Sequence, residues 1–200
     1  MRQRIEIIEI LLLAVLITVL GEPVFKLAAF RCKVEKEAVY FPVGEDICGK
    51  QRLFFEDSFG DGRSFGGKRK HEGCDIMAEN DVAGYFPVFS VSDGIVENLG
   101  WLELGGYRVG IRSPGGIYYY YAHLDRYAKG LSKGSRVTAG TLLGFMGDSG
   151  YGREGTRGQF PVHLHFGVYT GKAEKGENPF WILKRLAKKQ IAFVPVPVVQ

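Results

Sequence analysis

The sequence contains few cysteines and none of the cysteine spacings that bind zinc. Its three cysteines are Cys32, Cys48 and Cys74, and no two of them form a CxxC pair. This excludes a zinc site built from paired thiolates. Cys32 and Cys48 could form a disulfide if the chain is exported, or both could be free buried thiols. Helix-turn-helix, zinc-finger and RNA-binding patterns are also lacking, so we expect no nucleic-acid partner.

An uncharged apolar run of about 20 residues, the length needed to cross a bilayer, is lacking at the N-terminus. The apolar stretch there follows Arg2 and Arg4, is interrupted by two glutamates, and is uncharged only over residues 10–21. That length suits a signal-peptide core, and the leading arginines favour export of the rest of the chain. We interpret residues 1–21 as a signal peptide or a membrane anchor, so the protein would be secreted or anchored in the extracytoplasmic cell envelope. The alternative is a buried helix of a cytoplasmic protein.

Glycine, in contrast, is abundant, with 28 residues against 8 prolines, and aromatic residues make up 13% of the chain. Glycine supplies the positive φ angles of tight turns, which is typical of short strands joined by sharp corners. The net charge of +4 would suit a polyanionic surface such as a cell wall, although many soluble proteins carry a similar charge. Nothing in the sequence indicates an oligomeric state.

From residue 52 onward the pattern is one of short strands followed by one helix. Strands are predicted at residues 88–96, 107–111, 117–122, 137–146 and 162–169. Asn178 can cap a helix that has Pro179 at its first position and ends near Lys189. We therefore predict an all-β core with a short C-terminal helix. The expected organisation is a linker or lead-in over 22–51, one domain over 52–190 and a tail over 191–200.

All four histidines lie in this β region, and two of them are neighbours in His163-Leu164-His165. Residues two apart on a strand share a face, so both imidazoles can reach one small site. One can bind a metal while the other acts beside it. Structural histidines or a cupin metal pair would give the same pattern, but a cupin needs a glutamate where this chain has Tyr169.

A second pattern is His71-Glu72-Gly73-Cys74-Asp75. His71 and Asp75 are both good zinc ligands, and a helical turn or a bend entering a strand can bring them together. The alternative is an exposed loop in which the two residues occur by chance. Cys74 lies next to Asp75, and because neighbouring side chains of a strand point to opposite faces, we expect Cys74 to pack in the core.

Together, the two patterns predict a catalytic zinc site. His71, Asp75 and His165 would be three protein ligands, which leaves one position open, as catalytic zinc requires. His123 and His163 would then be free to transfer protons and to stabilise an oxyanion.

His123 belongs to the motif Tyr121-Ala122-His123-Leu124. Regular strand alternation predicts that it shares a face with Tyr119 and Tyr121, which would line a cleft.

At these motifs the sequence resembles the lysostaphin-type, or LytM-type, zinc metallopeptidases. The resemblance covers about residues 52–182. Beyond the three histidine motifs it includes the Asp57-Ser58-Phe59-Gly60 lead-in with Arg63, the glycine-spaced run from Val137-Thr138-Ala139-Gly140 to Gly150, and Asn178-Pro179.

The resemblance implies an antiparallel β sandwich of the duplicated-hybrid-motif type with an open groove. It implies that His71, Asp75 and His165 bind Zn²⁺ and that His123 and His163 form the catalytic pair. The implied activity is zinc-dependent hydrolysis of peptide bonds in peptidoglycan stem peptides or cross-bridges. The resemblance leaves open which of His123 and His163 is the general base.

The segment between Ser149 and Pro161 is longer and more charged than the corresponding link in the family, and we expect it to border the groove. Three other functions stay open at this point. The chain could be a catalytically silent envelope scaffold or amidase activator with this fold, a cytoplasmic phosphocarrier with paired histidines, or a wall-binding module. The filled set of five site positions and the N-terminal segment favour the peptidase.

Overall fold

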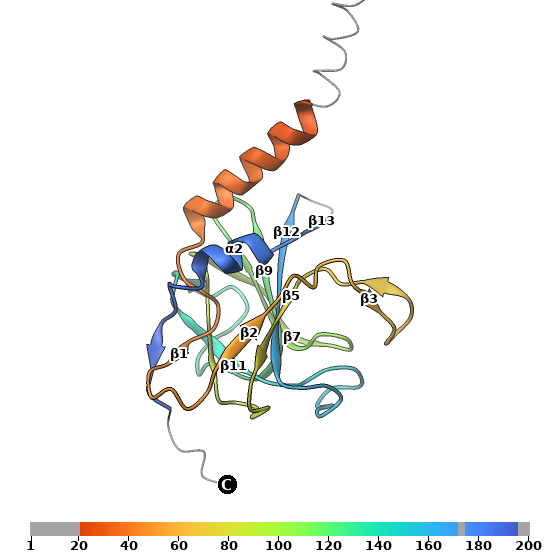
Figure 1. Ribbon diagram of the computed structural model, residues 1–200, viewed down its shortest axis with the longest axis vertical. Coiled ribbons are helices and arrows are strands. Elements are labelled where there is room, and N and C mark those ends of the chain that lie inside the picture. The colour runs from red at the N-terminus through yellow and green to blue at the C-terminus, as the bar shows by residue number, and fades with distance from the viewer. Residues whose placement is uncertain (1–20, 172–174, 196–200) are drawn as a thin grey trace, which may run out of the picture. The chain divides into compact units, whose positions relative to one another are not determined.

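The computed structural model describes residues 21–171 and 175–195 (Figure 1). The chain divides into two compact units, Met1–Lys36 and Glu37–Gln200. Residues 21–37 are helical. Nearly all of the predicted signal peptide or anchor lies outside the described residues. Within the described part of the chain, no helix is both long and apolar enough to cross a membrane.

The second unit is built mainly from antiparallel strands, which confirms the predicted all-β fold (Figure 1). Its main sheet follows the order β10-β7-β8-β9-β12-β5-β2, with β11 paired to both β9 and β6, and β13 paired to β12. The strands of this sheet are β2 (Leu53–Phe55), β5 (Cys74–Ala78), β6 (Pro87–Phe89), β7 (Gly94–Leu102), β8 (Gly106–Arg112), β9 (Tyr118–Tyr127), β10 (Arg136–Val137), β11 (Leu142–Met146), β12 (His163–Thr170) and β13 (Lys175–Glu177).

Two strand pairs lie outside the main sheet. The hairpin of β3 (Gly62–Arg63) and β4 (Arg69–Lys70) precedes β5. The strands β1 (Glu45–Asp46) and β14 (Ala192–Phe193) form a parallel pair that joins the beginning of the unit to its end.

Two of the predicted strands are each divided by a turn. The predicted strand 88–96 becomes β6 and β7, with the expected turn between them, and the predicted strand 137–146 becomes β10 and β11. The second break contains Gly140, whose φ of 86° is the left-handed backbone that a glycine adopts without strain.

The C-terminal helix α2 is Phe180–Leu186 and ends before Lys189. Asn178 precedes it, and its Oδ1 accepts a hydrogen bond of 2.8 Å from the Phe180 N–H. Ile182, Leu183 and Leu186 are buried, so this short helix is held by its apolar face.

The second compact unit begins at Glu37, within the segment expected to be a linker or lead-in. Phe41 and Val43 are fully buried, and β1 pairs with β14, which lies in the predicted tail. Such short segments have a weak sequence signal because their structure comes from pairing with distant residues. Cys32 and Cys48 are free and exposed, so they are not a pair of buried thiols.

The central strands of the sheet have one face in the core and one face in the pocket. On β5, Cys74 and Ile76 are fully buried, which confirms that Cys74 packs in the core, while Asp75 between them points to the other side. On β12, Leu164 and Phe166 are fully buried and alternate with the histidines. The side chains of His165 and Asp75 therefore emerge from the same face of the sheet, because the two residues pair directly across β12 and β5.

The predicted face of His123 is wrong. Tyr119 and Tyr121 are fully buried in the core, and it is Tyr120 and Ala122 that share the pocket with His123. His123 has a φ of 62°, and the pairing of β8 with β9 shifts register next to it. This irregularity breaks the two-residue alternation and turns the imidazole to the pocket face.

Candidate metal centre and active site

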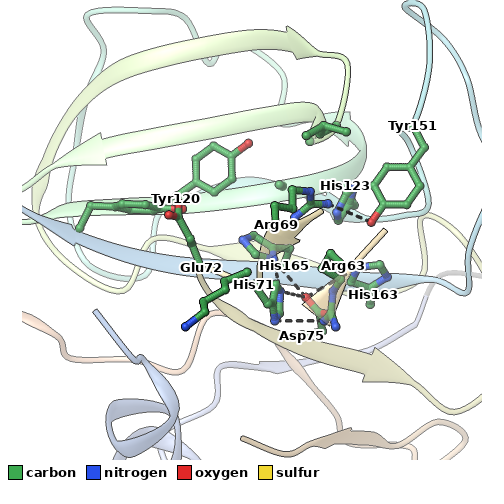
Figure 2. Close-up of a pocket in the computed structure, with 15 residues that line it drawn as sticks. Arg63, Arg69, His71, Glu72, Asp75, Tyr120, His123, Tyr151, His163 and His165 are labelled. Atoms are coloured by element: carbon green, nitrogen blue, oxygen red, sulfur yellow. Dashed lines mark hydrogen bonds and ion pairs between the residues drawn. The ribbon is translucent and has the colours of Figure 1, made fainter. Parts of the chain in front are cut away.

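A pocket with a volume of about 320 Å³ lies on the exposed face of the central strands and contains all four histidines (Figure 2). Asp75 comes from β5, His123 from β9, and His163 and His165 from β12. His71 precedes β5. The structure thus brings together the five residues that the sequence indicated.

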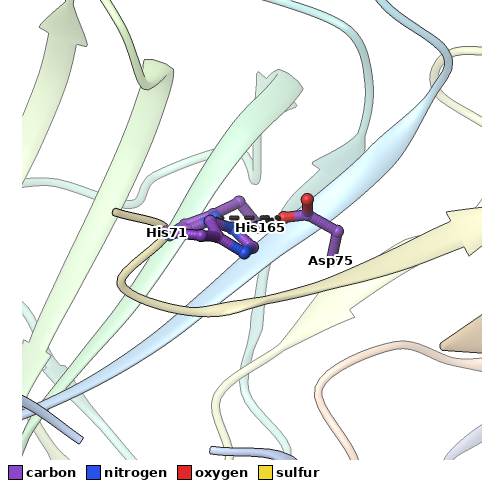
Figure 3. A group of neighbouring side chains, drawn as sticks. All are labelled: His71, Asp75 and His165. Carbon is purple, nitrogen blue, oxygen red and sulfur yellow. Dashed lines mark hydrogen bonds and ion pairs between the residues drawn. The ribbon is translucent and has the colours of Figure 1, made fainter. Parts of the chain in front are cut away.

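Three of these residues form a compact cluster of potential metal ligands (Figure 3). His71 Nε2 lies 2.8 Å from His165 Nδ1, and Asp75 Oδ1 lies 3.1 Å from each of these nitrogens. Two imidazole nitrogens and a carboxylate oxygen on one side of a pocket are the donor set of a catalytic zinc site.

Backbone contacts determine which nitrogen of His71 faces the cluster. Its Nδ1 lies 2.8 Å from the carbonyl oxygen of Ser58, which can only accept, so Nδ1 carries the proton. Arg63 Nη2 also lies 3.0 Å from this nitrogen, but a protonated Nδ1 has no lone pair to offer it. Nε2 is therefore the nitrogen that faces the cluster, and it points toward Asp75 and His165.

Asp75 has a separate partner for each of its carboxylate oxygens. Oδ1 faces the two histidines, while Oδ2 accepts a hydrogen bond of 2.9 Å from Arg63 Nη2. Burial alone would raise the pKa of Asp75, but the hydrogen bonds from His165 and His71 outweigh it and hold the pKa far below its usual range. The carboxylate is thus ionised and fixed in orientation, as a metal ligand needs to be.

The close approach of His71 to β12 depends on Gly73. A Cβ at this position would lie 2.6 Å from His165 Cε1 and from the backbone oxygen of Phe166. Any other residue at position 73 would push the segment before β5 away from β12 and would separate His71 from His165.

The other two histidines are held differently, by backbone carbonyls. His123 Nδ1 lies 2.8 Å from the Ser149 carbonyl oxygen, and His163 Nδ1 lies 2.7 Å from that of Pro161. Both Nδ1 atoms therefore carry the proton, which leaves both Nε2 atoms with a lone pair in the pocket. The two ring centroids are 4.7 Å apart, and His163 Nε2 lies 3.8 Å from Asp75 Oδ1.

Burial lowers the pKa values of His123, His163 and His165 below the usual histidine value. For His123 the neighbouring His163 and His165 lower it further. Neutral imidazoles are the form that binds a metal or accepts a proton, so near pH 7 this pocket is prepared for both roles.

The sequence profile of peptidase family M23 matches residues 69–179, which is more than half of the 200-residue chain. The chain belongs to peptidase family M23. Peptidases of this family are zinc-dependent, in agreement with the His-Asp-His cluster.

Two curated relatives have sequences similar to this M23 chain. One is the L-Ala–D-Glu endopeptidase of Bacillus subtilis (strain 168), with 44% identity over 128 residues, or 63% of this chain and 38% of the relative. The other is the glycyl-glycine endopeptidase ALE-1 of Staphylococcus capitis, with 33% identity over 102 residues, or 49% of this chain and 26% of the relative. The chain thus matches well under half of the length of either relative.

A similar solved structure is that of a protein from Ruminococcus gnavus ATCC 29149 that carries the name LytM. It shares 46% sequence identity and has a TM-score of 0.74, covering 80% of this chain and 65% of the other. This likeness confirms the LytM-like β fold predicted from the sequence.

The long segment between β11 and β12 borders the pocket of this M23 domain, as expected. Tyr151 lines the pocket, and the ring centroid of Phe160 lies 4.6 Å from that of His123 and 5.1 Å from that of His163. Phe160 thus packs against the rings of His123 and His163. The same segment also holds these two rings, through the carbonyls of Ser149 and Pro161 at its ends.

An aromatic stack connects this segment to the β3–β4 hairpin. Phe65 and Tyr151 lie with ring centroids 4.2 Å apart and planes inclined by 7°, and Arg69 Nη2 donates a hydrogen bond of 3.3 Å to the Tyr151 hydroxyl. Figure 2 shows Tyr151 at one end of the pocket and Tyr120 toward the other, with the histidines between them.

Sequence reasoning missed the roles of several pocket residues. Arg63 appeared only as part of the family resemblance, and its contact with Asp75 had no signal of its own. Phe65 and Tyr120 were not singled out. A β-strand in which four tyrosines occur in succession has two aromatic faces, and only the register with β12 shows which face lines the pocket.

Proposed function

We propose that the protein is a zinc metalloendopeptidase that hydrolyses peptide bonds in peptidoglycan stem peptides or cross-bridges. In this proposal His71, Asp75 and His165 hold the zinc ion, and His123 and His163 are the catalytic pair. The observation that carries it is the meeting of two different histidine arrangements in one pocket: a three-residue cluster with converging donor atoms and a pair with free Nε2 atoms.

The residues fit a zinc ion on the chemistry of the donors. His71 presents Nε2 to the cluster because its Nδ1 is held by a carbonyl, and Asp75 is ionised. Two imidazole nitrogens and a carboxylate oxygen that converge in this way are donors that zinc binds well. When bound, zinc supplies Lewis-acid chemistry, because it polarises a carbonyl group and lowers the pKa of water.

The chain's own residues supply the remaining steps. The free Nε2 of one histidine of the His123–His163 pair accepts the proton of the attacking water, and the pair returns a proton to the amine that leaves. The other histidine, in its protonated form, stabilises the oxyanion of the tetrahedral intermediate, because only an Nε2–H can donate to the oxyanion. The Ser149 and Pro161 carbonyls hold the Nδ1–H of both rings, so each Nε2 faces the pocket, where it accepts a proton and, once protonated, can donate.

Cellular location belongs to the same proposal. The two curated relatives are named for peptide bonds of L-Ala–D-Glu and glycyl-glycine type, which occur in cell-wall peptidoglycan. We therefore place the protein outside the cytoplasm, in the cell envelope. Residues 1–21 would direct its export and would either be cleaved or remain as an anchor.

The test is mass spectrometry of purified peptidoglycan after incubation with the full chain. Cross-linked or stem fragments should be lost over time, a zinc chelator should stop the reaction, and added zinc should restore it. The masses of the fragments identify the cleaved bond.

The alternative is a catalytically silent scaffold or amidase activator with the same fold. A protein that binds zinc but leaves every wall fragment intact would support this alternative and contradict the peptidase. A catalytically silent variant, His163→Ala, is the matched control for contaminating hydrolases.

A further inference from the structure

A second hollow adjoins the pocket at its Tyr120 end. It has a volume of about 510 Å³ and shares Leu104, Gly105, Tyr120 and Tyr169 with the histidine pocket. We call it the Arg108 hollow, because Arg108 of β8 provides its basic side chain. A ligand lying along the histidine pocket can therefore continue past Tyr120 into the Arg108 hollow.

Arg108 has unsatisfied hydrogen-bond donors. Its side chain is half-buried, and its Nε and Nη1 are buried without a hydrogen-bond partner among the described residues. Glu103 lines the same hollow but does not pair with these two nitrogens. By contrast, Arg63 and Arg112 each contact a carboxylate. A buried donor without an acceptor destabilises a fold, so Arg108 indicates an acceptor that the described residues do not supply.

The chemistry of the hollow defines the missing group. A guanidinium offers a planar fork of donors that suits a carboxylate or a phosphate. Around it are tyrosine side chains, among them Tyr118 and Tyr120, whose faces suit the apolar parts of a peptide. Gly105 completes the wall beside Tyr120, because a Cβ there would lie 2.3 Å from the Tyr120 hydroxyl oxygen.

We propose that the Arg108 hollow is a substrate subsite in which Arg108 binds a carboxylate of an acidic peptide while the bond to be cut lies beside the histidines. This inference rests on the proposed peptidase function and narrows its substrate class. A glycine bridge carries no side-chain carboxylate and would leave Arg108 without a partner. A stem peptide in which glutamate is linked through its γ-carboxyl keeps a free α-carboxylate, which supplies the required acceptor.

Binding of two matched peptides tests the subsite. The probes are L-Ala–γ-D-Glu–L-Lys with the glutamate α-carboxyl either free or amidated, so that they differ in one negative charge. They are titrated into the zinc-loaded full chain carrying His163→Ala, which should bind without cleaving. The free carboxylate should bind about 10-fold to 100-fold more tightly, as expected for charge-assisted hydrogen bonds.

Substitutions at Arg108 assign the preference to this side chain. Arg108→Gln should make the two peptides bind equally, and Arg108→Lys should keep part of the preference because it keeps the charge. Arg136→Gln is the matched control, since it removes the same charge from an exposed residue of β10 that lines neither hollow. Zinc content and melting temperature of each variant show whether the fold and the metal site are intact.

Two outcomes would overturn the subsite: equal binding of the two peptides by the parent chain, or an unchanged preference in Arg108→Gln. A competition experiment with inorganic phosphate tests a third outcome. If phosphate displaces both peptides and neither peptide binds more tightly than the other, the hollow is a site for a free anion. Since binding needs no turnover, an Arg108-dependent preference in a wild-type chain that cleaves no wall would count against the proposed function alone.

Discussion

The two pairs of histidines in the pocket are held by different parts of the molecule. His71 and His165 face each other and Asp75 across a framework of paired strands. His123 and His163 are each tied through Nδ1 to a carbonyl at one end of the segment between β11 and β12. The sheet therefore positions Asp75 and His165, two of the three proposed metal ligands, whereas the segment at residues 149–161 holds the proposed proton-transfer pair. Zinc binding and hydrolysis should thus be separable by mutation.

The largest expected effect is a difference in zinc binding between variants of His165 and His163. His165→Ala removes a ligand and should abolish both zinc binding and hydrolysis, while His163→Ala should keep most of the zinc and lose hydrolysis by at least about 100-fold. The measurements are zinc content by mass spectrometry and fragment release from peptidoglycan. Equal loss of zinc in the two variants would contradict the proposed division between a zinc-binding His165 and a proton-transferring His163.

A smaller effect is expected at Arg63, which holds the metal-free oxygen of Asp75. Arg63→Met should weaken zinc affinity by about 10-fold to 100-fold, because it removes the group that orients a ligand. At saturating zinc, much of kcat should return. Arg112→Met is the control, since it breaks a similar ion pair with Glu97. A normal zinc affinity in Arg63→Met would show that Asp75 needs no such support.

The next effect concerns the carbonyl that holds His123. Ser149 Oγ donates to the Leu124 carbonyl at 2.6 Å and accepts from the Tyr107 N–H at 3.0 Å. Ser149→Ala should cost about 1–3 kcal/mol of unfolding free energy and lower kcat, with zinc content unchanged.

Ser90→Ala serves as the control for Ser149→Ala. It removes another buried hydroxyl, one that donates to the Ser92 carbonyl at 2.7 Å and lines neither hollow. An equal fall of kcat in both variants would show a general loss of stability and not a role of Ser149 in orienting His123.

The smallest expected effect lies outside the pocket, at Asp46. Burial would raise the pKa of Asp46, but hydrogen bonds from the Tyr85 hydroxyl and from three backbone N–H groups hold the pKa below its usual value. A lowered pKa in the folded state contributes stability above the unfolded value of about 3.9, and this contribution is lost as the pH falls through the folded pKa.

Asp46→Asn should therefore melt at a lower temperature than the wild type at pH 7, and the difference should shrink below about pH 4. Zinc content and hydrolysis should stay normal at moderate temperature. A difference in melting temperature that does not change with pH would contradict the ionic origin of the effect.

The shared face of His163 and His165 and the opposite faces of Cys74 and Asp75 could be predicted from the sequence because regular strands obey a fixed alternation, whereas His71 lies outside the strands. His163-Leu164-His165 and Cys74-Asp75 lie on such strands, so spacing alone showed which side chains share a face. His123 did not follow this rule, because a positive φ angle and a register shift change its face. A single sequence carries no clear signal for such a bulge, since His123 is flanked by ordinary strand residues.

Contacts between distant segments were the other part that the sequence did not predict. The hydrogen bond of Arg63 to Asp75 depends on how the β3–β4 hairpin folds over β5, and the stack of Phe65 on Tyr151 joins residues far apart in the chain. Residues 37–51 were interpreted as part of a linker because their apolar residues follow no regular period. Their partners lie at the other end of the domain.

The parallel pairing of β1 with β14 brings residue 45 beside residue 192, so the first and last strands of the domain are paired with each other. The stretch that matches the family, residues 69–179, contains neither of these strands. A fragment limited to that stretch would lack Phe41 and Val43, so the core residues that these two side chains cover would be exposed. A circular permutant that joins residue 193 to residue 37 through a linker should, in contrast, keep Phe41, Val43 and the β1–β14 pair, with its new ends in a surface turn.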